Sequence, residues 1–383
     1  MIVMIITILI FTTYLILMLY YRYNWKRAPT FEITTRGITA KNDLASGTFV
    51  SVIIAARNEE KNISACLESI VAQNYLKVKY EVIVVDDHST DQTASLVRSF
   101  KNNIRLISLE AKGSGIINSY KKRAIETGIA AAKGDLIITT DADCIAPRSW
   151  LKNMVYFFEE FNPAFIAAPV AYYGETNFLQ IFQSLDFMTM QGITCAAVYK
   201  NFHTMCNGAN LAYPKQNFYQ VGGFSGIDHI ASGDDMLLMH KIAAEFPGKI
   251  FFLKSQGAIV LTKPAASMSE FFQQRIRWAS KAGKYADKRI TTVLLLVYLL
   301  NLWILLLFIF SCFYHTFLIW LIGLLAGKIL VELFFLVPVA IFFGKQKLLW
   351  WFPLAQPFHI LYIVVAGWLG KFGSYRWKER KVK

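Results

Sequence analysis

Residues 135–144, DLIITTDADC, form an apolar run that ends on two carboxylates. The β-branched residues of that run are typical of a buried strand in a parallel sheet. Asp141 and Asp143 stand at positions i and i+2, so both side chains can reach one bound ion directly or through water. Mg²⁺ or Mn²⁺ takes oxygen ligands and is commonly held by one or two carboxylates together with a diphosphate. The stretch predicts a divalent-metal site, although an isolated Asp-x-Asp pattern is also typical of a turn or a helix cap.

The sequence before this stretch alternates between short strands and helix-length segments. Strands are predicted at 49–55, 80–85 and 104–109, followed by the strand 135–140 of the opening stretch, with helices that end at residue 70 and span 91–100 and 121–133. Such alternation predicts a parallel α/β sheet. Polar side chains follow the first two strands: Asn58, Glu59, Asp86 and Asp87. Because ligands bind at the carboxyl edge of open α/β sheets, we expect these residues to converge with the Asp-Ala-Asp triplet in one crevice.

A dinucleotide-binding sheet of the dehydrogenase kind is excluded by the first strand–helix connection. That fold needs GxGxxG directly after the first strand, whereas the chain has AARNEE at 55–60. The GxG at 113–115 follows the third strand and lacks the rest of the motif. After the second strand, Ser89 or Thr90 is expected to cap the next helix. The dipole of that helix can stabilise one of the two preceding aspartates, which leaves the other for a base or a ribose.

Apolar residues crowd into the first 21 residues and into 290–370 of this 383-residue chain, whose mean hydropathy is +0.38. The uncharged run 2–21 is about one bilayer long and predicts a membrane anchor. The run 291–343 predicts two spans that break near 311–315. Lys328 and Glu332, its charged residues, are four apart and can pair on one helix face.

The third apolar block, 348–369, contains Pro353 and Pro357. If it were a further span, the basic tail 371–383 would lie outside, against the positive-inside rule, so we expect an interfacial segment. Basic residues cluster where the apolar runs end, which explains the net charge of +14 without nucleic acid. Five scattered cysteines argue against disulfides or a zinc site and fit a domain that faces the cytoplasm.

Two further motifs follow the Asp-Ala-Asp triplet. Asp234 and Asp235 precede the apolar segment MLLMHKIAAEF, where they can cap a helix or deprotonate a hydroxyl. The segment 269–285, SEFFQQRIRWASKAGKY, mixes apolar and basic residues. It can form an amphipathic helix on the membrane surface, or Arg277 can contact a diphosphate while Trp278 stacks on a sugar ring.

These motifs, in this order, resemble the family 2 glycosyltransferases, which are inverting enzymes of the GT-A fold. The similar stretches are IIAARNEE at 53–60, VVDDHSTD at 84–91, TTDADC at 139–144, GDD at 233–235 and QRIRW at 274–278. Within that family the chain is similar to the membrane-integrated branch that contains cellulose, hyaluronan and poly-N-acetylglucosamine synthases and ceramide glucosyltransferase.

The resemblance implies a role for each motif residue. Asn58, Glu59, Asp86 and Asp87 would line the nucleotide pocket with Lys121. Asp141 and Asp143 would bind the metal, with Asp143 the firmer ligand and Asp141 alternatively serving the nucleotide or the sugar. Asp235 would be the base, and Gln274, Arg277 and Trp278 would serve the acceptor and the diphosphate. Residues 207–210 and 222–224 resemble the segment that shapes the sugar and acceptor pocket. Asp234 competes for the role of the base, and Tyr120 in place of the usual glycine leaves Lys122 as an alternative to Lys121.

The predicted organisation has five parts: an anchor at 1–22, a GT-A domain at 48–265, an amphipathic interfacial segment at 266–289, a membrane region at 290–370 and a basic cytoplasmic tail at 371–383. The predicted protein is a cell-membrane enzyme that uses Mg²⁺ or Mn²⁺ and transfers a sugar from a UDP-sugar to a lipid, lipid-linked or glycan acceptor. A processive polysaccharide synthase is the first alternative, and it would need an oligomer or a partner subunit to complete a channel. A transporter or sensor with a nucleotide-binding domain is the second.

Overall fold

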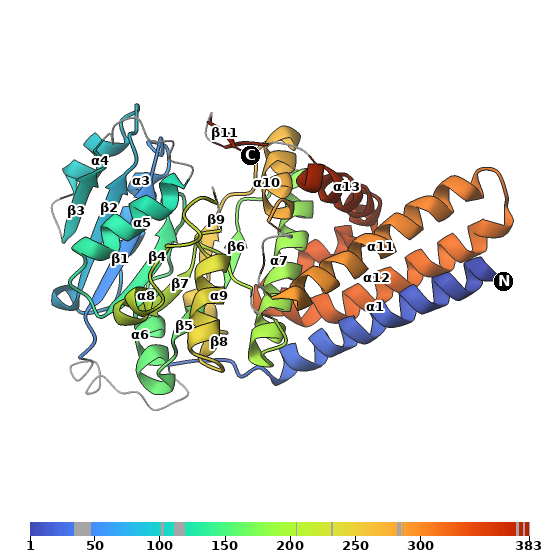
Figure 1. Ribbon diagram of the computed structural model, residues 1–383, viewed down its shortest axis with the longest axis horizontal. Helices are drawn as coiled ribbons and strands as arrows, with labels where there is room; N and C mark the ends of the chain where they lie inside the picture. The colour runs from blue at the N-terminus through green and yellow to red at the C-terminus, as the bar shows by residue number, and fades with distance from the viewer. Residues whose placement is uncertain are drawn as a thin grey trace. The chain divides into compact units, whose positions relative to one another are not determined.

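The computed structural model describes residues 1–33, 47–100, 103–110, 119–203, 205–230, 233–281, 285, 287–372, 375–377 and 380–382. These residues form two compact units (Figure 1). We call Pro29–Tyr173 with Thr204–Lys263 the sheet unit, and Met1–Ala28 with Gly174–His203 and Pro264–Lys383 the helix unit. The segment 174–203, which the sequence placed inside the GT-A domain, groups with the helix unit.

The sheet unit is built on a mixed sheet with the strand order β3-β2-β1-β4-β7-β5-β8. Its strands are β1 Val50–Ala56, β2 Tyr80–Asp86, β3 Ile104–Ser108, β4 Leu136–Asp141, β5 Phe165–Ala167, β7 Leu211–Pro214 and β8 Ile250–Phe252. The first four strands run parallel, and β7 is antiparallel to both β4 and β5. The predicted α/β class is confirmed, and each of the four predicted strands ends within one residue of its expected position.

Helices and a small second sheet complete this unit. The helices are α3 Ile63–Val71, α4 Thr93–Ser99, α5 Tyr120–Ala131, α6 Trp150–Phe161, α8 Lys215–Gln220 and α9 Met236–Glu245, with 3-10 turns η2 Lys77–Lys79 and η3 Gln256–Ala258. Strands β6 Val170–Tyr172 and β9 Val260–Thr262 pair separately in parallel. Helix α5 packs closely on β1 and β2 through Gly128, where an added Cβ would lie 2.6 Å from the Cγ2 of Ile53. That close approach places the first turn of α5 near the carboxyl edge of the sheet.

The direction of the strand order changes at β1, which has β2 on one side and β4 on the other. In register, Ala56 pairs with Asp86 and Ala55 pairs with Asp141. Two of the predicted acidic residues therefore lie at one edge of the sheet, on either side of the end of β1. The switch point of an open α/β sheet is where ligands bind.

The helix unit contains long apolar helices and ends in a short hairpin. Its elements are α1 Ile2–Arg27, α7 Phe178–Tyr199, α10 Met268–Ala279, α11 Lys288–Ser311, α12 Thr316–Phe342, η5 Gln346–Trp351, α13 Phe352–Phe372, β10 Tyr375–Trp377 and β11 Arg380–Val382. Among the described residues, four helical stretches are long and apolar enough to cross a membrane: Ile2–Arg27, Lys288–Ser311, Thr316–Phe342 and Gln346–Gly370. The break between α11 and α12 falls at 312–315, where the sequence predicted it.

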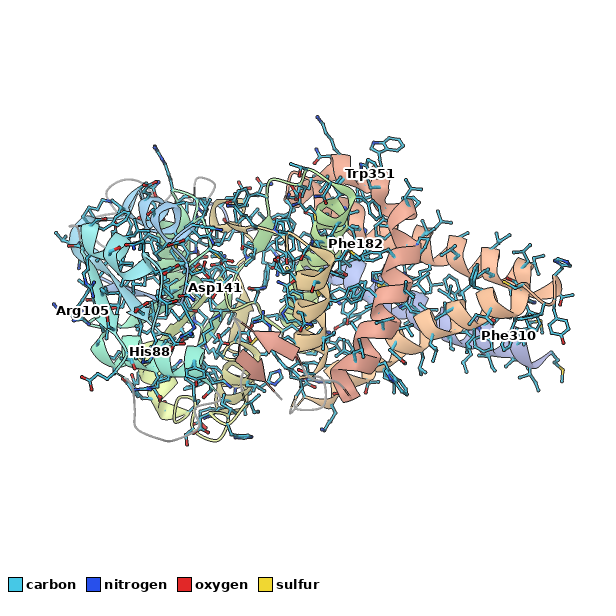
Figure 2. The ribbon with its side chains drawn as sticks, turned by 90° about the horizontal axis from the view of Figure 1, so that it is seen from above. His88, Arg105, Asp141, Phe182, Phe310 and Trp351 are labelled. Atoms are coloured by element: carbon cyan, nitrogen blue, oxygen red, sulfur yellow. The ribbon has the colours of Figure 1, made fainter. Side chains whose placement is uncertain are left out.

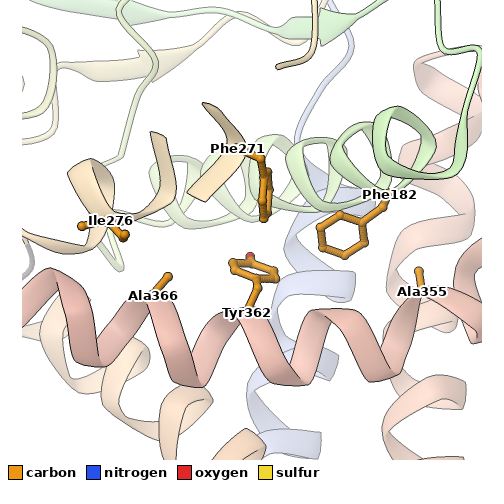
Figure 3. Packing of buried hydrophobic residues seen from close by; sticks show 6 residues of the cluster. All are labelled: Phe182, Phe271, Ile276, Ala355, Tyr362 and Ala366. Atoms are coloured by element: carbon orange, nitrogen blue, oxygen red, sulfur yellow. The ribbon is translucent and has the colours of Figure 1, made fainter. Parts of the chain in front are cut away.

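Within the helix unit, α13 lies across α1, α11 and α12 instead of running alongside them (Figures 2 and 3). It lies side by side with the amphipathic α10, since Phe271 packs on Phe358 at a centroid distance of 5.8 Å and on Tyr362 at 5.3 Å. Further along both helices, Gly370 lies against Ala279. If α1, α11 and α12 cross the membrane, this orientation places α10 and α13 along its surface, as an interfacial segment would lie.

Lys328 and Glu332, the charged pair inside the apolar region, have hydrogen-bond partners on neighbouring helices. Lys328 and Glu332 of α12 are buried, and their nitrogen and oxygen lie 2.8 Å apart, which confirms the pairing predicted from their spacing. Tyr14 of α1 donates a hydrogen bond to Glu332, and the amide of Gln356 in α13 donates to the same carboxylate at 2.7 Å. The pair therefore joins three helices.

Candidate active site

Lys121 links two of the predicted acidic motifs in the sheet unit. Its Nζ lies 2.7 Å from Oδ1 of Asp141, at the end of β4, and 3.2 Å from Oδ2 of Asp234, just before α9. Burial lowers the pKa of Lys121, but the charges of Asp141 and Asp234 more than offset that effect and raise the pKa above its ordinary value. Lys121 is therefore cationic at neutral pH and balances part of the negative charge of Asp141 and Asp234, which we call the acidic cluster (Asp141 is labelled in Figure 2).

Asp235 is the N-cap residue of α9, and both of its carboxylate oxygens accept backbone hydrogen bonds. Oδ1 accepts from the N–H of Met236 at 2.7 Å, and Oδ2 accepts from the N–H of Gly208 at 3.1 Å. Asp235 therefore caps α9, which was one of the two roles predicted for it, and the role as a base stays a prediction. A Cβ on Gly208 would lie 3.3 Å from Nζ of Lys121. The segment at 207–210 therefore lies against the acidic cluster, without a side chain at its closest point.

Asp143 follows β4 in a turn, and like Asp141 it is partly exposed. Its Oδ1 lies 3.6 Å from the Sγ of the buried Cys144. Among the described residues, no group of three or more His, Cys, Asp or Glu side chains gathers in a way that could hold a metal. A pair of partly exposed carboxylates fits Mg²⁺ or Mn²⁺, because these ions complete their coordination with water and substrate phosphates. The donor set at 141 and 143 is therefore suited to such an ion.

The end of β1 is tied to the loop after β2 by short polar contacts. Asn58 has a positive φ of 51°, and its Oδ1 accepts a hydrogen bond from the N–H of Thr90 at 2.9 Å. The N–H of Asn58 donates to Oγ of Ser89 at 3.0 Å, and the N–H of Glu59 donates to Oγ1 of Thr93 at 2.8 Å. Asn58 and Glu59 thus lie next to the loop that follows Asp86 and Asp87, as predicted.

Asp86 and Asp87 have different surroundings. Oδ1 of Asp87 lies 3.0 Å from Nδ1 of His88 (labelled in Figure 2), and the Asp87 backbone carbonyl accepts from Arg57 at 2.7 Å. Asp86 is buried, and its Oδ1 has no hydrogen-bond partner among the described residues. Because an unpaired buried carboxylate oxygen is costly, this atom is suited to accept from a ligand hydroxyl or amine.

The expected cap of α4 was wrong. Neither Ser89 nor Thr90 caps the helix; instead Oδ1 of Asp91 accepts from the N–H of Thr93 at 3.0 Å and from its hydroxyl at 2.6 Å. Ser89 and Thr90 bond to Asn58 instead. A local sequence pattern could not distinguish these roles, because the competing partner lies on a different strand end.

Gln274, Arg277 and Trp278 lie on α10 and belong to the helix unit. The helix is capped by Ser267, whose hydroxyl accepts from the N–H of Glu270 at 3.2 Å, and Glu270 accepts from the N–H of Ala266, the residue before the cap, at 3.0 Å. Oε1 of Gln274 is buried without a hydrogen-bond partner among the described residues, which suits a residue that awaits a ligand. The roles of these three residues stay predictions.

The structure distinguishes the two candidate lysines. Lys122 is buried, and its Nζ donates to the carbonyls of Ile227 at 2.7 Å and Ile230 at 2.6 Å, whereas Lys121 contacts the carboxylates of Asp141 and Asp234. Cys66 lies under the triplet with its Sγ 3.6 Å from the carbonyl of Asp141, and burial raises its thiol pKa. The sequence offered both lysines as candidates, because they are adjacent, but did not decide between them. The position of Cys66 had none.

Part of the chain, which includes most of the sheet unit, matches a known protein family. Residues 51–227 match the model of the family described as Glycosyl transferase family 2. The chain is 39% identical over 110 residues to glycosyltransferase AglE of Haloferax volcanii, a match that covers 28% of this chain and 34% of the relative. It is 34% identical over 111 residues to the dolichyl N-acetyl-alpha-D-glucosaminyl phosphate 3-beta-D-2,3-diacetamido-2,3-dideoxy-beta-D-glucuronosyltransferase of Methanococcus voltae, covering 28% of this chain and 33% of that protein.

A solved structure resembles nearly the whole chain. The mannosyltransferase PcManGT from Pyrobaculum calidifontis, in complex with GDP-Man and Mn²⁺, aligns with a TM-score of 0.58 and 18% identity, covering 96% of this chain and 98% of that one. This likeness supports the fold, whereas the sequence matches above span only about a third of each relative. The family match confirms the resemblance drawn from the motifs. The chain carries a glycosyltransferase family 2 domain with the GT-A fold.

Proposed function

We propose that this protein is a membrane-bound inverting glycosyltransferase that transfers a sugar from a nucleotide-diphospho-sugar to a lipid or lipid-linked acceptor. The observation that carries the proposal is the cluster of Lys121, Asp141 and Asp234, of which the first two lie within the residues 51–227 that match family 2. Long apolar helices in the same chain favour an acceptor at the membrane. A UDP-sugar is the proposed donor, and the cell membrane with the sheet unit in the cytoplasm is the proposed location.

The donor would lie at the edge formed by β1, β2 and β4. Asp86, with its unpaired buried oxygen, is suited to a ribose or base donor group, and Asn58, Glu59 and Asp87 would line the remainder of the nucleotide pocket. Asp141 and Asp143 would hold Mg²⁺ or Mn²⁺, which when bound neutralises charge on the departing nucleoside diphosphate.

Asp235 is proposed as the base that takes the proton of the acceptor hydroxyl. Its two backbone hydrogen bonds fix the direction of the carboxylate, and each oxygen retains a lone pair for the hydroxyl. Asp234 is the weaker candidate, because its Oδ2 already pairs with Lys121. The hydroxyl would attack the anomeric carbon as the bond to the diphosphate breaks, which inverts the configuration through an oxocarbenium-like transition state.

A lipid-linked acceptor is favoured by one of the relatives. The name of the Methanococcus voltae protein describes a sugar transferred to a dolichyl phosphate-linked sugar. A processive synthase that also secretes its polymer needs a channel, which an oligomer or a partner subunit would have to complete. A transporter is disfavoured, because the buried Lys328–Glu332 pair is already satisfied by Tyr14 and Gln356 and so resembles a structural pair.

The deciding experiment incubates the purified full chain with UDP- and GDP-sugars, Mn²⁺ or Mg²⁺, and membrane lipids, and scores the products by mass spectrometry. Single addition to a lipid is the expected result, whereas a polymer would favour the synthase. Asp143→Asn and Asp235→Asn should each abolish transfer while the protein stays folded. Near-normal turnover by Asp235→Asn would move the base to Asp234, and the absence of any turnover by the wild-type chain would contradict the proposal.

A further inference from the structure

We propose that Asp186 of α7 and Tyr362 of α13 are positioning residues, which act through Arg275 to fix the orientation of the motif residues Gln274, Arg277 and Trp278 on α10. The inference rests on the proposed function for what those motif residues do. It stands on a set of contacts inside the helix unit, which we call the Arg275 clasp: Arg275, Asp186 and Tyr362.

The clasp joins three helices through buried polar groups. Nη2 of Arg275 lies 2.8 Å from Oδ2 of Asp186, and the hydroxyl of Tyr362 donates to Oδ1 of the same carboxylate at 2.7 Å. Arg275 is 4% exposed and Asp186 is 8% exposed, so the ion pair is held away from water. Both oxygens of Asp186 are therefore engaged, one by α10 and one by α13.

Aromatic rings surround the guanidinium group. Its Cζ lies 4.3 Å from the ring centroid of Trp278, 5.0 Å from that of Phe271 and 6.0 Å from that of Tyr362. Phe187 of α7 adds a ring 6.3 Å from Trp278 on centroids. The motif tryptophan thus lies directly against the cation of the clasp, a contact that strengthens when water is excluded.

The hydrophobic part of the same interface packs around the clasp (Figure 3). Phe182, Phe271, Ile276, Ala355, Tyr362 and Ala366 form one buried cluster drawn from α7, α10 and α13. This packing holds the helices together but leaves rotation about the axis of α10 to directional contacts. The ion pair, the hydroxyl and the ring stacking supply that direction.

This geometry gives Arg275 and Arg277, the two arginines of the motif segment, different surroundings. Arg275 has its charge compensated by Asp186 in a buried place, so breaking the pair to bind a diphosphate would leave an unpaired buried carboxylate. Arg277 is partly exposed on the same helix, whereas Arg275 is buried. Since α10 is a continuous helix, holding Arg275 also sets the direction of Gln274, Arg277 and Trp278.

The first test uses Tyr362→Phe, which removes the hydroxyl and keeps the packed ring. In the full chain with Mn²⁺ and either UDP-GlcNAc or GDP-Man, whichever is turned over, we expect kcat to fall about 10- to 100-fold. The KM for the nucleotide sugar should stay within about threefold, because the loss concerns alignment and not donor binding. Ser184→Ala is the matched control, since it removes a buried hydroxyl from α7 that bonds to Glu175, outside the clasp. An unchanged kcat in Tyr362→Phe overturns the proposal.

A paired variant distinguishes positioning from stability. Asp186→Leu and Arg275→Met each leave one buried charge without its partner and should lower Tm strongly, whereas the double variant removes both charges and should recover most of the Tm. A positioning role predicts that kcat stays low in the double variant. Recovery of kcat together with Tm would show that the clasp only stabilises the fold, and would refute the proposal.

A readout that needs no turnover separates this inference from the proposed function. Hydrogen exchange of the amides at 274–278 should be faster in Tyr362→Phe than in Ser184→Ala, because the clasp restrains α10. If the wild-type chain turned over no nucleotide sugar, the proposed function would fail. The exchange measurement would still test whether the Arg275 clasp restrains α10. Equal exchange in the two variants would contradict the positioning role.

Discussion

Lys121 and Lys122 are neighbours in α5, yet their ammonium groups bind different parts of the sheet unit. Lys121 joins the carboxylates of Asp141 and Asp234, and Lys122 donates to the backbone carbonyls of Ile227 and Ile230. Adjacent positions on a helix point about 100° apart, which explains the division. One lysine thus organises the acidic cluster, while the other holds the loop that leads towards the Gly-Asp-Asp motif.

Replacing the two lysines should give opposite results. Lys121→Met removes the cation that competes for Oδ1 of Asp141, so Mn²⁺ should bind about tenfold more tightly or better, while sugar transfer falls about 100-fold. Lys122→Met removes two hydrogen bonds, those to the carbonyls of Ile227 and Ile230, and should lower the free energy of unfolding by about 1–3 kcal/mol. Calorimetric Mn²⁺ titration and thermal unfolding of both variants check this. Weaker Mn²⁺ binding by Lys121→Met would contradict the competition.

The acidic site residues were predictable from sequence for a physical reason, and the clasp was not. The carboxyl ends of adjacent parallel strands meet at one edge, so Asp86 and Asp141 could be placed together from strand boundaries alone. Asp186 and Tyr362 are 176 residues apart on two helices, and their contact depends on how those helices pack. No periodicity within either helix specifies such a partner.

At the scale of elements, the strands were easier to predict than the junctions between them. The buried β-branched runs of β1, β2 and β4 ended within one residue of expectation, because burial on both faces leaves a continuous apolar signal. The cap of α4 was missed, because Ser89 and Thr90 bond to Asn58 and the N-cap residue, Gln92, makes no side-chain cap bond. The orientation of α13 could be argued only from charge parity, since length and composition alone also fit a span.

The loop before α7 is tied to the turn after α12 by Glu175 and Lys345. Burial raises the pKa of Glu175, but hydrogen bonds from Lys345 and Ser184 more than offset this and hold it below the ordinary 4.5. A depressed carboxyl pKa stabilises the fold above the ordinary value and loses that contribution as pH falls through the lowered pKa. Wild-type Tm should therefore fall on acidification below about pH 4.5 by more than the Tm of Lys345→Met.

The control for this pair is Lys347→Met, which removes a charge two positions further along η5. Its Tm should keep the wild-type dependence on pH, measured as the difference between neutral and acidic buffer in the same detergent. If Lys345→Met and Lys347→Met showed the same dependence, the Glu175 contact would contribute nothing to it.

At the scale of the whole chain, the crossing orientation of α13 predicts one membrane topology. With α1, α11 and α12 as spans and α10 and α13 along the surface, the tail lies on the same side of the membrane as the segment between α1 and α11. The turn between α11 and α12 then lies on the opposite side. This arrangement agrees with the basic residues at the end of α1 and in the tail, which favour the cytoplasmic leaflet.

Cysteine labelling in intact cells tests this topology with a residue that is already present. Cys312, at the α11–α12 turn, is exposed, whereas Cys66, Cys144 and Cys195 are buried and Cys206 is partly buried. A membrane-impermeant maleimide should label Cys312 from outside. A cysteine introduced at the tail, Lys383→Cys, should react only after the cells are opened. Labelling of both positions from outside would make α13 a fourth span and would contradict the interfacial placement.

Two contacts of α1 can form only late in the synthesis of the chain. Its Thr7 accepts a hydrogen bond from Trp303 and its Tyr14 donates one to Glu332, partners that lie 296 and 318 residues further along the chain. At a ribosomal rate of roughly 5–20 residues per second, α1 waits on the order of 15–60 s for them. During that interval the sheet unit emerges and can fold while it is held at the membrane by a single helix. If translation paused before residue 303, the sheet unit could already be folded. The hydroxyls of Thr7 and Tyr14 in α1 would then still lack Trp303 and Glu332 as partners.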